Sequence, residues 1–250
     1  MTPSLLALVS ALGLAAASMA AFALLGGRRD QDAQQKGASF AMGVGDFFVH
    51  WFMWVIRPIE RLLLGLGVGP DAMNLGGLVC GAASGVLIGL GHVEWGGWAI
   101  VAGGICDVLD GRLARARRLV SPYGAFIDST LDRFVEVFAF LGFVFFLRDF
   151  AWGPLLAAAA ITGSLLVSYT RARGESVGVL CKEGLMQRAE RLVLTCLACL
   201  SDAPLSSALG QPRGTVILWT VGLIAAGTFV TAAHRTLWIS ARLRERTPGV

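Results

Sequence analysis

The stretch CDVLDGRLARARRLVSPYGAFIDSTLDRF, residues 106–134, places four aspartates inside two runs that otherwise have the composition of membrane-spanning helices. These aspartates are Asp107, Asp110, Asp128 and Asp132. On membrane-insertion scales, one aspartate at the centre of a spanning helix costs about 2.5–3.5 kcal/mol, so four cost on the order of 10 kcal/mol before any pairing or solvation. The fold must therefore contain an interaction that offsets this cost.

The rest of the chain has the composition of an integral membrane protein. Of its 250 residues, 55% are hydrophobic, and the mean hydropathy is +0.67. The net charge of +4 comes from Lys and Arg residues that cluster between apolar runs, which is typical of a cytoplasmic membrane face. No basic tract is interleaved with aromatic residues as a nucleic-acid groove requires, so we expect no nucleic-acid partner.

The five cysteines argue against a disulfide framework, because their number is odd and most lie within apolar runs. Cys196 and Cys199 form a CxxC motif inside the apolar run LVLTCLACL. We interpret them as two small apolar residues of a buried helix rather than as a redox or metal-binding pair.

The N-terminal part of the chain precedes the main membrane domain. The apolar run Leu5–Leu25 lacks the basic flank of a signal peptide, so we interpret residues 1–26 as an uncleaved membrane anchor. A polar linker follows at 27–40. Residues 41–69 mix aromatic and charged side chains, and we interpret them as an amphipathic segment on the membrane surface, in which Pro58 is expected to interrupt a continuous helix.

Six further apolar runs predict the main domain, residues 70–241, which is followed by a cytoplasmic tail at 242–250. A hydrocarbon core of about 30 Å takes about 20 residues per helix. The runs lie at about 72–91, 97–117, 122–147, 153–172, 188–204 and 214–240, and turn signals such as SDAPLSSALGQPRG at 201–214 separate them. The predicted fold is all-α: a six-helix transmembrane bundle, an interfacial amphipathic helix before it, and an extra N-terminal anchor helix.

The distribution of Lys and Arg predicts the orientation of this bundle. Nearly all of them fall on one side, and the opposite loops hold only Arg148 and Arg213. The basic side is therefore cytoplasmic, and the four aspartates lie toward it. We expect a protein of a bacterial-type inner (cytoplasmic) membrane whose active site faces the cytoplasm.

Any of three interactions would offset the free-energy cost of the aspartates: solvation near the interface, pairing with nearby arginines, or binding of a cation. Asp107 and Asp110 have i,i+3 spacing and Asp128 and Asp132 have i,i+4 spacing, so each pair projects from one helix face. A short loop joins the two antiparallel helices, so the faces can meet. Four like charges then repel unless protons or metal ions neutralise them. All-oxygen ligands suit hard divalent cations such as Mg²⁺ or Mn²⁺.

Two glycines and an arginine extend the acidic face. Gly111 follows Asp107 by four residues and Gly124 precedes Asp128 by four, so each glycine removes one side chain beside the carboxylates and a phosphate-bearing ligand can approach the backbone. Arg115 lies one turn beyond Gly111 and can pair with a phosphate. Carboxylate-bound metal, phosphate and arginine together are typical of phosphoryl transfer.

The same residues resemble the signature of the CDP-alcohol phosphotransferase family (CDP-alcohol phosphatidyltransferase class-I), which is D-x2-D-G-x2-A-R, eight residues, G-x3-D-x3-D. All eight fixed positions are present with every spacing intact. They are Asp107, Asp110, Gly111, Ala114, Arg115, Gly124, Asp128 and Asp132. The resemblance covers at least residues 57–240, because the surface segment and the six spans also fit the family's layout.

The resemblance implies a function. Members of the family transfer a phosphatidyl or similar group from a CDP-linked lipid, such as CDP-diacylglycerol, to the hydroxyl of a polar acceptor alcohol, and they release CMP. By resemblance, the four aspartates bind two divalent ions, with Mg²⁺ expected and Mn²⁺ as the alternative, and Asp132 is the general base. Gly111, Ala114, Arg115 and Gly124 would line the CDP site. The resemblance also implies contact with membrane lipid and a homodimer.

Three arginines outside the signature bear on the acceptor: Arg171, Arg191 and Arg235. Positive-inside anchoring explains each of them, although Arg235 lies within a span, where an arginine usually faces a polar cavity. If they converge near the metals, they suit an acceptor that already carries a phosphate. The pattern most resembles the phosphatidylinositol-phosphate synthase branch, in which Arg-Pro-Glu-Arg stands where this chain has Arg188-Ala189-Glu190-Arg191. Inositol phosphate is therefore the favoured acceptor.

Alternative functions stay open. A phosphatidylglycerophosphate synthase, or a family member with another acceptor, would use the same kind of pocket. A divalent-cation transporter would also carry carboxylates within the membrane, but its site would be expected near the midplane, with helix breaks and repeated halves. The acidic helices hold no internal Pro, and the chain shows no repeat. A scaffold without catalysis is disfavoured because all four aspartates are present. Arg133 and Glu136 flank the acidic face, and we expect them to pair within the bundle.

Overall fold

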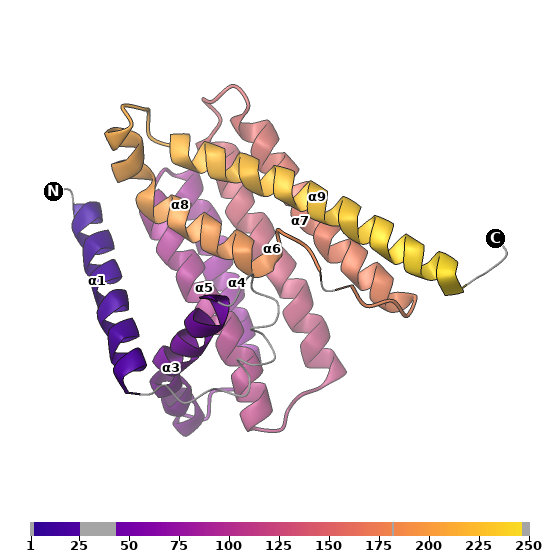
Figure 1. Cartoon of the computed structure of the whole chain (residues 1–250). Helices are drawn as coiled ribbons and strands as arrows, with labels where there is room; N and C mark the ends of the chain where they lie inside the picture. The colour runs from indigo at the N-terminus through magenta and orange to yellow at the C-terminus, as the bar shows by residue number, and fades with distance from the viewer. Residues whose placement is uncertain (1–2, 26–43, 182, 247–250) are drawn as a thin grey trace. The chain divides into compact units, whose positions relative to one another are not determined.

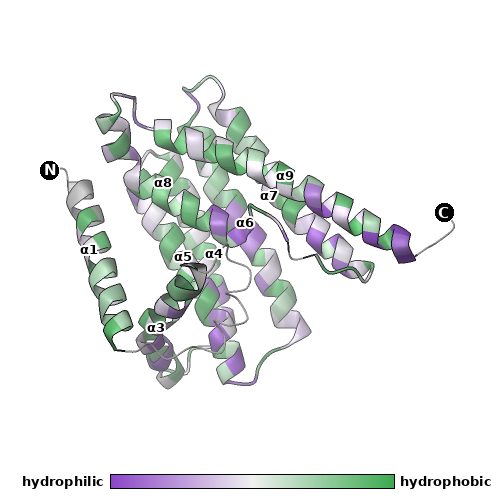
Figure 2. Cartoon of the chain, viewed as in Figure 1, coloured by the Kyte–Doolittle hydropathy of each residue, from purple (hydrophilic) through white to green (hydrophobic). Residues whose placement is uncertain are grey.

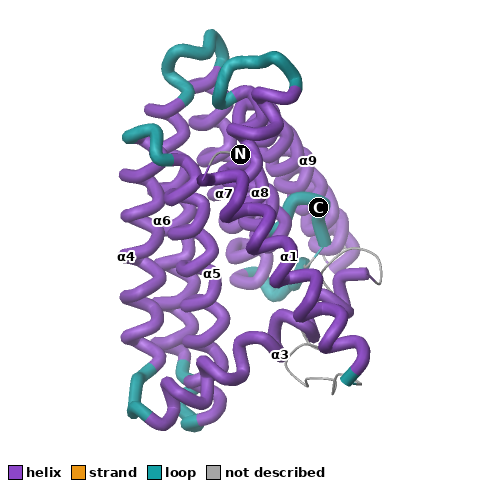
Figure 3. The backbone as a smooth tube through the Cα atoms, turned by 90° about the vertical axis from the view of Figure 1, so that its left-hand side faces the viewer, coloured by secondary structure: helices purple, strands orange, loops and turns teal. Residues whose placement is uncertain are grey.

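The computed structural model describes residues 3–25, 44–181 and 183–246, and their regular structure is all helix (Figure 1). Figure 3 shows helices and loops, with no strand in these ranges. The helices are α1 (Pro3–Leu24), α3 (Val44–Gly65), α4 (Pro70–Gly89), α5 (Val93–Ala116), α6 (Pro122–Phe146), α7 (Gly153–Ser176), α8 (Arg188–Ala208) and α9 (Thr215–Arg246). The predicted all-α class is confirmed. The predicted linker at 27–40 and the end of the predicted tail, 247–250, lie outside the described residues.

The helices α4 to α9 coincide with the six predicted spans to within four residues at each end, except that α9 continues to Arg246, into the predicted tail. Among the described helices, α4, α7 and α9 are long and apolar enough to cross a membrane. Figure 2 shows α9 as mainly hydrophobic, with a hydrophilic C-terminal end. Helices α5, α6 and α8 each carry at least four charged residues, so these charges must be paired, coordinated or solvated if the helices lie in hydrocarbon.

Two expectations about helix boundaries were wrong, both at prolines. Helix α3 runs through Pro58 without interruption, and α8 runs through Pro204 to Ala208, so the turn that was predicted from residue 201 begins at Leu209. Proline removes one helical hydrogen bond, but contacts on either side can hold the helix together. In α8 the buried Asp202 supplies such a contact.

Asp202 joins the end of α8 to the start of α9. Its Oδ2 accepts a hydrogen bond from the backbone N–H of Gly214 at 2.7 Å, and its Oδ1 accepts one from Val216 at 3.1 Å. The first N–H groups of a helix have no partner within that helix, so a carboxylate satisfies them and also interacts favourably with the helix dipole. This buried acid therefore has a structural role.

The chain divides into two compact units, Met1–Gly81 with Ala99–Val135 and Ala82–Trp98 with Glu136–Val250. In the first unit, α1 packs on α3 through aromatic rings, since the ring of Phe22 lies 5.6 Å from that of Phe47 and 5.9 Å from that of Trp54. The indole N–H of Trp51 also donates a hydrogen bond to Ser18 Oγ at 3.0 Å. The amphipathic segment is thus a helix with the N-terminal helix packed on it.

In the second unit, α9 packs against α7 and α8. Two glycines bring α4 and α6 close together, because a Cβ on Gly85 would collide with the carbonyl oxygen of Phe138, and one on Gly142 would collide with that of Gly85. Small residues that allow backbones to approach in this way are typical of membrane helix pairs. The five cysteines are all free, and Cys196 and Cys199 are buried, as expected of apolar packing residues.

The crossing at Gly85 gives a stability prediction. Gly85→Ala forces a methyl group against a backbone carbonyl, so we expect the melting temperature in detergent to fall by about 5 °C. Gly222→Ala is the matched control, because its Cβ meets only the Leu156 side chain at 3.6 Å and alanine favours helix. Equal melting temperatures for the two variants would contradict the close crossing.

Candidate metal centre

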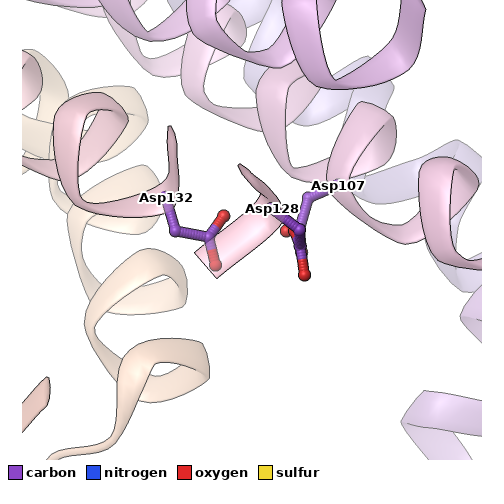
Figure 4. A group of neighbouring side chains, drawn as sticks. All are labelled: Asp107, Asp128 and Asp132. Atoms are coloured by element: carbon purple, nitrogen blue, oxygen red, sulfur yellow. The ribbon is translucent and has the colours of Figure 1, made fainter. Parts of the chain in front are cut away.

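Three of the four predicted metal ligands converge. Asp107 of α5 and Asp128 and Asp132 of α6 each offer a carboxylate oxygen, and these oxygens lie within 4.8 Å of one another. Figure 4 shows Asp107 and Asp128 side by side, with the carboxylate of Asp132 directed toward them. All three side chains are half-buried. The convergence of the two helix faces, expected from the spacing alone, is present for these three residues.

Asp110 lies one turn along α5 from Asp107 and is buried, but its carboxylate is not part of that group of three. Its Oδ1 accepts a hydrogen bond from the backbone N–H of Gly111. The i,i+3 spacing keeps Asp110 on the face of α5 that carries Asp107. Asp110 is therefore adjacent to the cluster.

The electrostatics of the cluster favour a bound cation. Two unit charges about 4 Å apart repel by about 4 kcal/mol at an effective dielectric constant of about 20, so three carboxylates at this range need neutralisation. Arg133 lies 3.9 Å from Asp132, and its guanidinium also donates to the carbonyl of Ser129. Three oxygen donors held on two helices fit the coordination preference of Mg²⁺ or Mn²⁺.

The predicted CDP-site residues lie on the same two helices. On α5, a Cβ on Gly111 would lie 3.3 Å from the guanidinium of Arg115, so this guanidinium lies over the glycine one turn before it. Arg115 is exposed and Ala114 between them is half-buried. In the first turn of α6, the N–H of Gly124 donates to Ser121 Oγ at 3.1 Å. The exposed guanidinium of Arg115 thus lies over Gly111, next to the turn of α5 that carries Asp107 and Asp110.

The predicted acceptor arginines belong to the second compact unit, and two of them are buried. Arg191 is 2% exposed, and its Nε and Nη2 donate to Glu136 Oε1 and Oε2 at 2.5 and 3.0 Å. Its Nη1 donates to the carbonyl of Met186 at 3.0 Å. Glu136, which was expected to pair within the bundle, therefore holds Arg191 in a bidentate pair.

Arg235 is 3% exposed and joins two segments of this unit. Its Nε donates to the carbonyl of Glu183 at 2.7 Å and its Nη1 to that of Val167 at 2.9 Å. Arg171 is instead 48% exposed, with Glu175 at 2.9 Å. Both Arg171 and Arg191 act electrostatically on Arg235, so the three charges gather in one region. Positive-inside anchoring, which needs arginines exposed at the membrane surface, does not account for the buried Arg191 and Arg235.

Sequence reasoning missed a second buried ion pair, in the first unit. Arg112 follows Gly111 on α5, and its Nε lies 2.7 Å from Glu60 Oε2 on α3. The signal in the sequence was a glutamate within an amphipathic segment that also carries other charged residues. The separation of 52 residues gave no local cue to its partner.

The chain matches the family model described as CDP-alcohol phosphatidyltransferase over residues 68–226. It is 35% identical over 197 residues to the phosphatidylinositol phosphate synthase of Streptomyces avermitilis, which covers 76% of this chain and 79% of that protein. It is 32% identical over 152 residues to the archaetidylinositol phosphate synthase of Methanothermobacter thermautotrophicus, covering 60% of this chain and 76% of that one.

Solved structures of a related enzyme are also similar. The crystal structure of the Mycobacterium tuberculosis phosphatidylinositol phosphate synthase with CDP-DAG bound has a TM-score of 0.62 and 26% identity, covering 73% of this chain and 92% of that chain. The same enzyme in complex with manganese and citrate has a TM-score of 0.64, covering 73% and 87%. The likeness therefore extends over most of the described helices.

The buried pair of Glu136 and Arg191 gives a second prediction. Glu136→Gln leaves the buried guanidinium without its counter-charge, so we expect the free energy of unfolding to fall by about 3–5 kcal/mol. Glu94→Gln removes the partner of the half-exposed Arg213 and should cost at most about 1 kcal/mol. Thermal unfolding in detergent measures both variants, and a loss for Glu136→Gln no larger than that of the control would contradict this role.

Proposed function

The chain belongs to the CDP-alcohol phosphatidyltransferase family, and we propose that it transfers the phosphatidyl group of CDP-diacylglycerol to a hydroxyl of inositol phosphate and releases CMP. The observation that carries the proposal is the cluster of Asp107, Asp128 and Asp132, whose oxygens lie within 4.8 Å of one another. The protein is a transferase of phospholipid biosynthesis that works at a membrane.

The proposed metal site consists of all four aspartates. Asp107, Asp128 and Asp132 form the compact group. In the proposal Asp110, one turn from Asp107, joins them to hold two Mg²⁺ ions, or Mn²⁺. Bound divalent ions supply charge neutralisation at the diphosphate of the CDP-lipid and stabilise charge at the phosphorus under attack. The mycobacterial relative in complex with manganese supports such a site here.

The proposed reaction takes place at the acidic face of α5 and α6. Asp132 accepts the proton of the acceptor hydroxyl, whose oxygen forms a bond to the lipid-side phosphorus. The bond from that phosphorus to the CMP phosphate breaks, and CMP leaves with the electron pair. Gly111, Ala114, Arg115 and Gly124 bind the CDP portion, because a glycine surface admits the phosphates and Arg115 lies over it. The relative with CDP-DAG bound supports this substrate.

The proposed acceptor site includes Arg171, Arg191 and Arg235. Three of the five N–H groups of Arg191 are already used by Glu136 and Met186, so Arg191 contributes mainly its charge and a fixed position. Arg235 is held by two backbone carbonyls. The half-exposed Arg171, whose exposed pair with Glu175 is weak, is the arginine best placed to receive a phosphate. Relatives named phosphatidylinositol phosphate synthase favour inositol phosphate over glycerol 3-phosphate.

We propose that α4 to α9 form a six-helix membrane domain, residues 70–241, in a bacterial inner membrane, with the site facing the cytoplasm and two copies forming a homodimer. The segment 41–69 lies on the membrane surface, and residues 1–26 anchor the chain. Exposed apolar side chains on α1, among them Leu12, Leu14 and Leu24, support contact with lipid. The basic segments on one side support the orientation.

Asp128→Asn tests the metal site. Loss of one carboxylate from the cluster should lower kcat for CMP release by about 100-fold or more, while the melting temperature stays the same or rises because a like charge is removed. Asp149→Asn, at an exposed position between α6 and α7, is the matched control and should leave kcat unchanged. Wild-type turnover by Asp128→Asn would refute the site.

Arg171→Ala tests the acceptor site. Because a hydrogen bond to a charged group is worth about 1.5–3 kcal/mol, the KM for inositol 1-phosphate should rise by about 10-fold or more. The KM for CDP-diacylglycerol should stay within about twofold of the wild-type value, because only the acceptor loses a hydrogen bond. Arg173→Ala, an exposed neighbour on the same helix, should change neither constant. Equal increases in both KM values for Arg171→Ala would remove Arg171 from the acceptor pocket.

A further inference from the structure

A buried ion pair joins helix α3 to the C-terminal half of α5, which carries Asp107 and Asp110 and is called the metal-bearing half below. The Nε of Arg112 lies 2.7 Å from Glu60 Oε2, and the two side chains are 7% and 14% exposed. Arg112 Nη1 also lies 3.3 Å from the sulfur of Met53, itself buried on α3. A charge pair buried to this degree is held in one geometry, because moving either partner leaves the other charge desolvated.

A second arginine ties the end of α5 to the end of α3. Arg117 Nη1 donates to the carbonyl of Gly67 at 3.0 Å, and its Nη2 lies 3.4 Å from the carbonyl of Leu64. The last carbonyls of a helix have no partner within that helix, and a cation satisfies them while it interacts favourably with the helix dipole. Gly67 has φ of +78°, as expected of a glycine that ends a helix.

One of these two contacts lies within, and the other just after, the part of α5 that carries the proposed chemistry, residues 107–115. Arg112 comes two residues after Asp110, and Arg117 comes two residues after Arg115. Leu109 and Leu113, on the turns around Arg112, are also buried, so this stretch of α5 is fixed by packing as well as by charge. The rotation of α5 about its axis decides where the carboxylates of Asp107 and Asp110 point.

We propose that Glu60 is a positioning residue for the metal site: by holding Arg112, it fixes the rotation of the metal-bearing half of α5. The inference rests on the proposed metal site but adds a residue from α3, outside the signature, to its support. Groups that orient metal ligands without touching the metal typically change metal affinity by about 10–100-fold when they are removed. A helix on the membrane surface thereby contributes to the geometry of the acidic cluster.

Binding of Mn²⁺ to the purified full-length protein in detergent, followed by electron paramagnetic resonance without substrate, tests this role. Glu60→Gln keeps the size of the side chain but removes its charge, and we expect its dissociation constant for Mn²⁺ to rise by about tenfold. Glu94→Gln breaks the Glu94–Arg213 pair in the other compact unit and should leave Mn²⁺ affinity unchanged. The charge-exchanged double variant Glu60→Arg with Arg112→Glu should restore part of the lost affinity.

The outcomes separate the inference from the proposed metal site. Wild-type Mn²⁺ affinity in Glu60→Gln, even with a lower melting temperature, would show that the pair has only a structural role and would overturn the inference. If Glu60→Gln fails to fold, Arg112→Lys, which keeps the charge but loses the planar geometry, must show the rise or the inference falls. If the wild-type protein and Asp128→Asn bind Mn²⁺ equally, the metal site itself is refuted.

Discussion

Mutual repulsion among carboxylates in an apolar protein is the constraint on which the rest of the structure depends. Asp107, Asp128 and Asp132 place oxygens within 4.8 Å of one another on helices with long apolar segments. Such a cluster is stable only with a counter-charge, and all-oxygen ligation indicates a hard divalent cation. In the function we propose, Gly111, Gly124 and the Arg115 guanidinium over Gly111 bind the phosphates of the CDP-lipid beside the metal ions that neutralise the carboxylates.

Three other charged side chains have specific partners within the described residues. Glu136 holds Arg191, Glu60 holds Arg112, and Asp202 accepts the first N–H groups of α9. These interactions let the charge-bearing helices α5, α6 and α8 belong to a membrane protein, although only α4, α7 and α9 among the described helices are long and apolar enough to be recognised as spans. They also commit Arg112 and Arg191 to structure, whereas Arg115 and Arg171, which we propose as ligand-binding cations, are exposed.

Local patterns in the sequence predicted the helices and the acidic site, because both depend on residues close in the chain. The i,i+3 and i,i+4 spacings placed the aspartates on shared faces, and the apolar runs located α4 to α9 within a few residues. Tertiary contacts explain the errors: α3 continues through Pro58 and α8 through Pro204, where packing outweighs the loss of one hydrogen bond. The pairing of Glu60 with Arg112 spans 52 residues and has no local signature.

The most direct test of the account is CMP release from CDP-diacylglycerol by the purified protein with Mg²⁺, with inositol 1-phosphate, glycerol 3-phosphate, free inositol and serine offered separately. We expect release with inositol 1-phosphate alone, and loss of that release when EDTA removes the metal. Release with glycerol 3-phosphate alone would agree with the family and with the acceptor site of Arg171, Arg191 and Arg235, but would replace inositol phosphate as the acceptor. Release with free inositol or serine alone would contradict the arginine site, and release that persists in EDTA would contradict the metal centre on which the account depends.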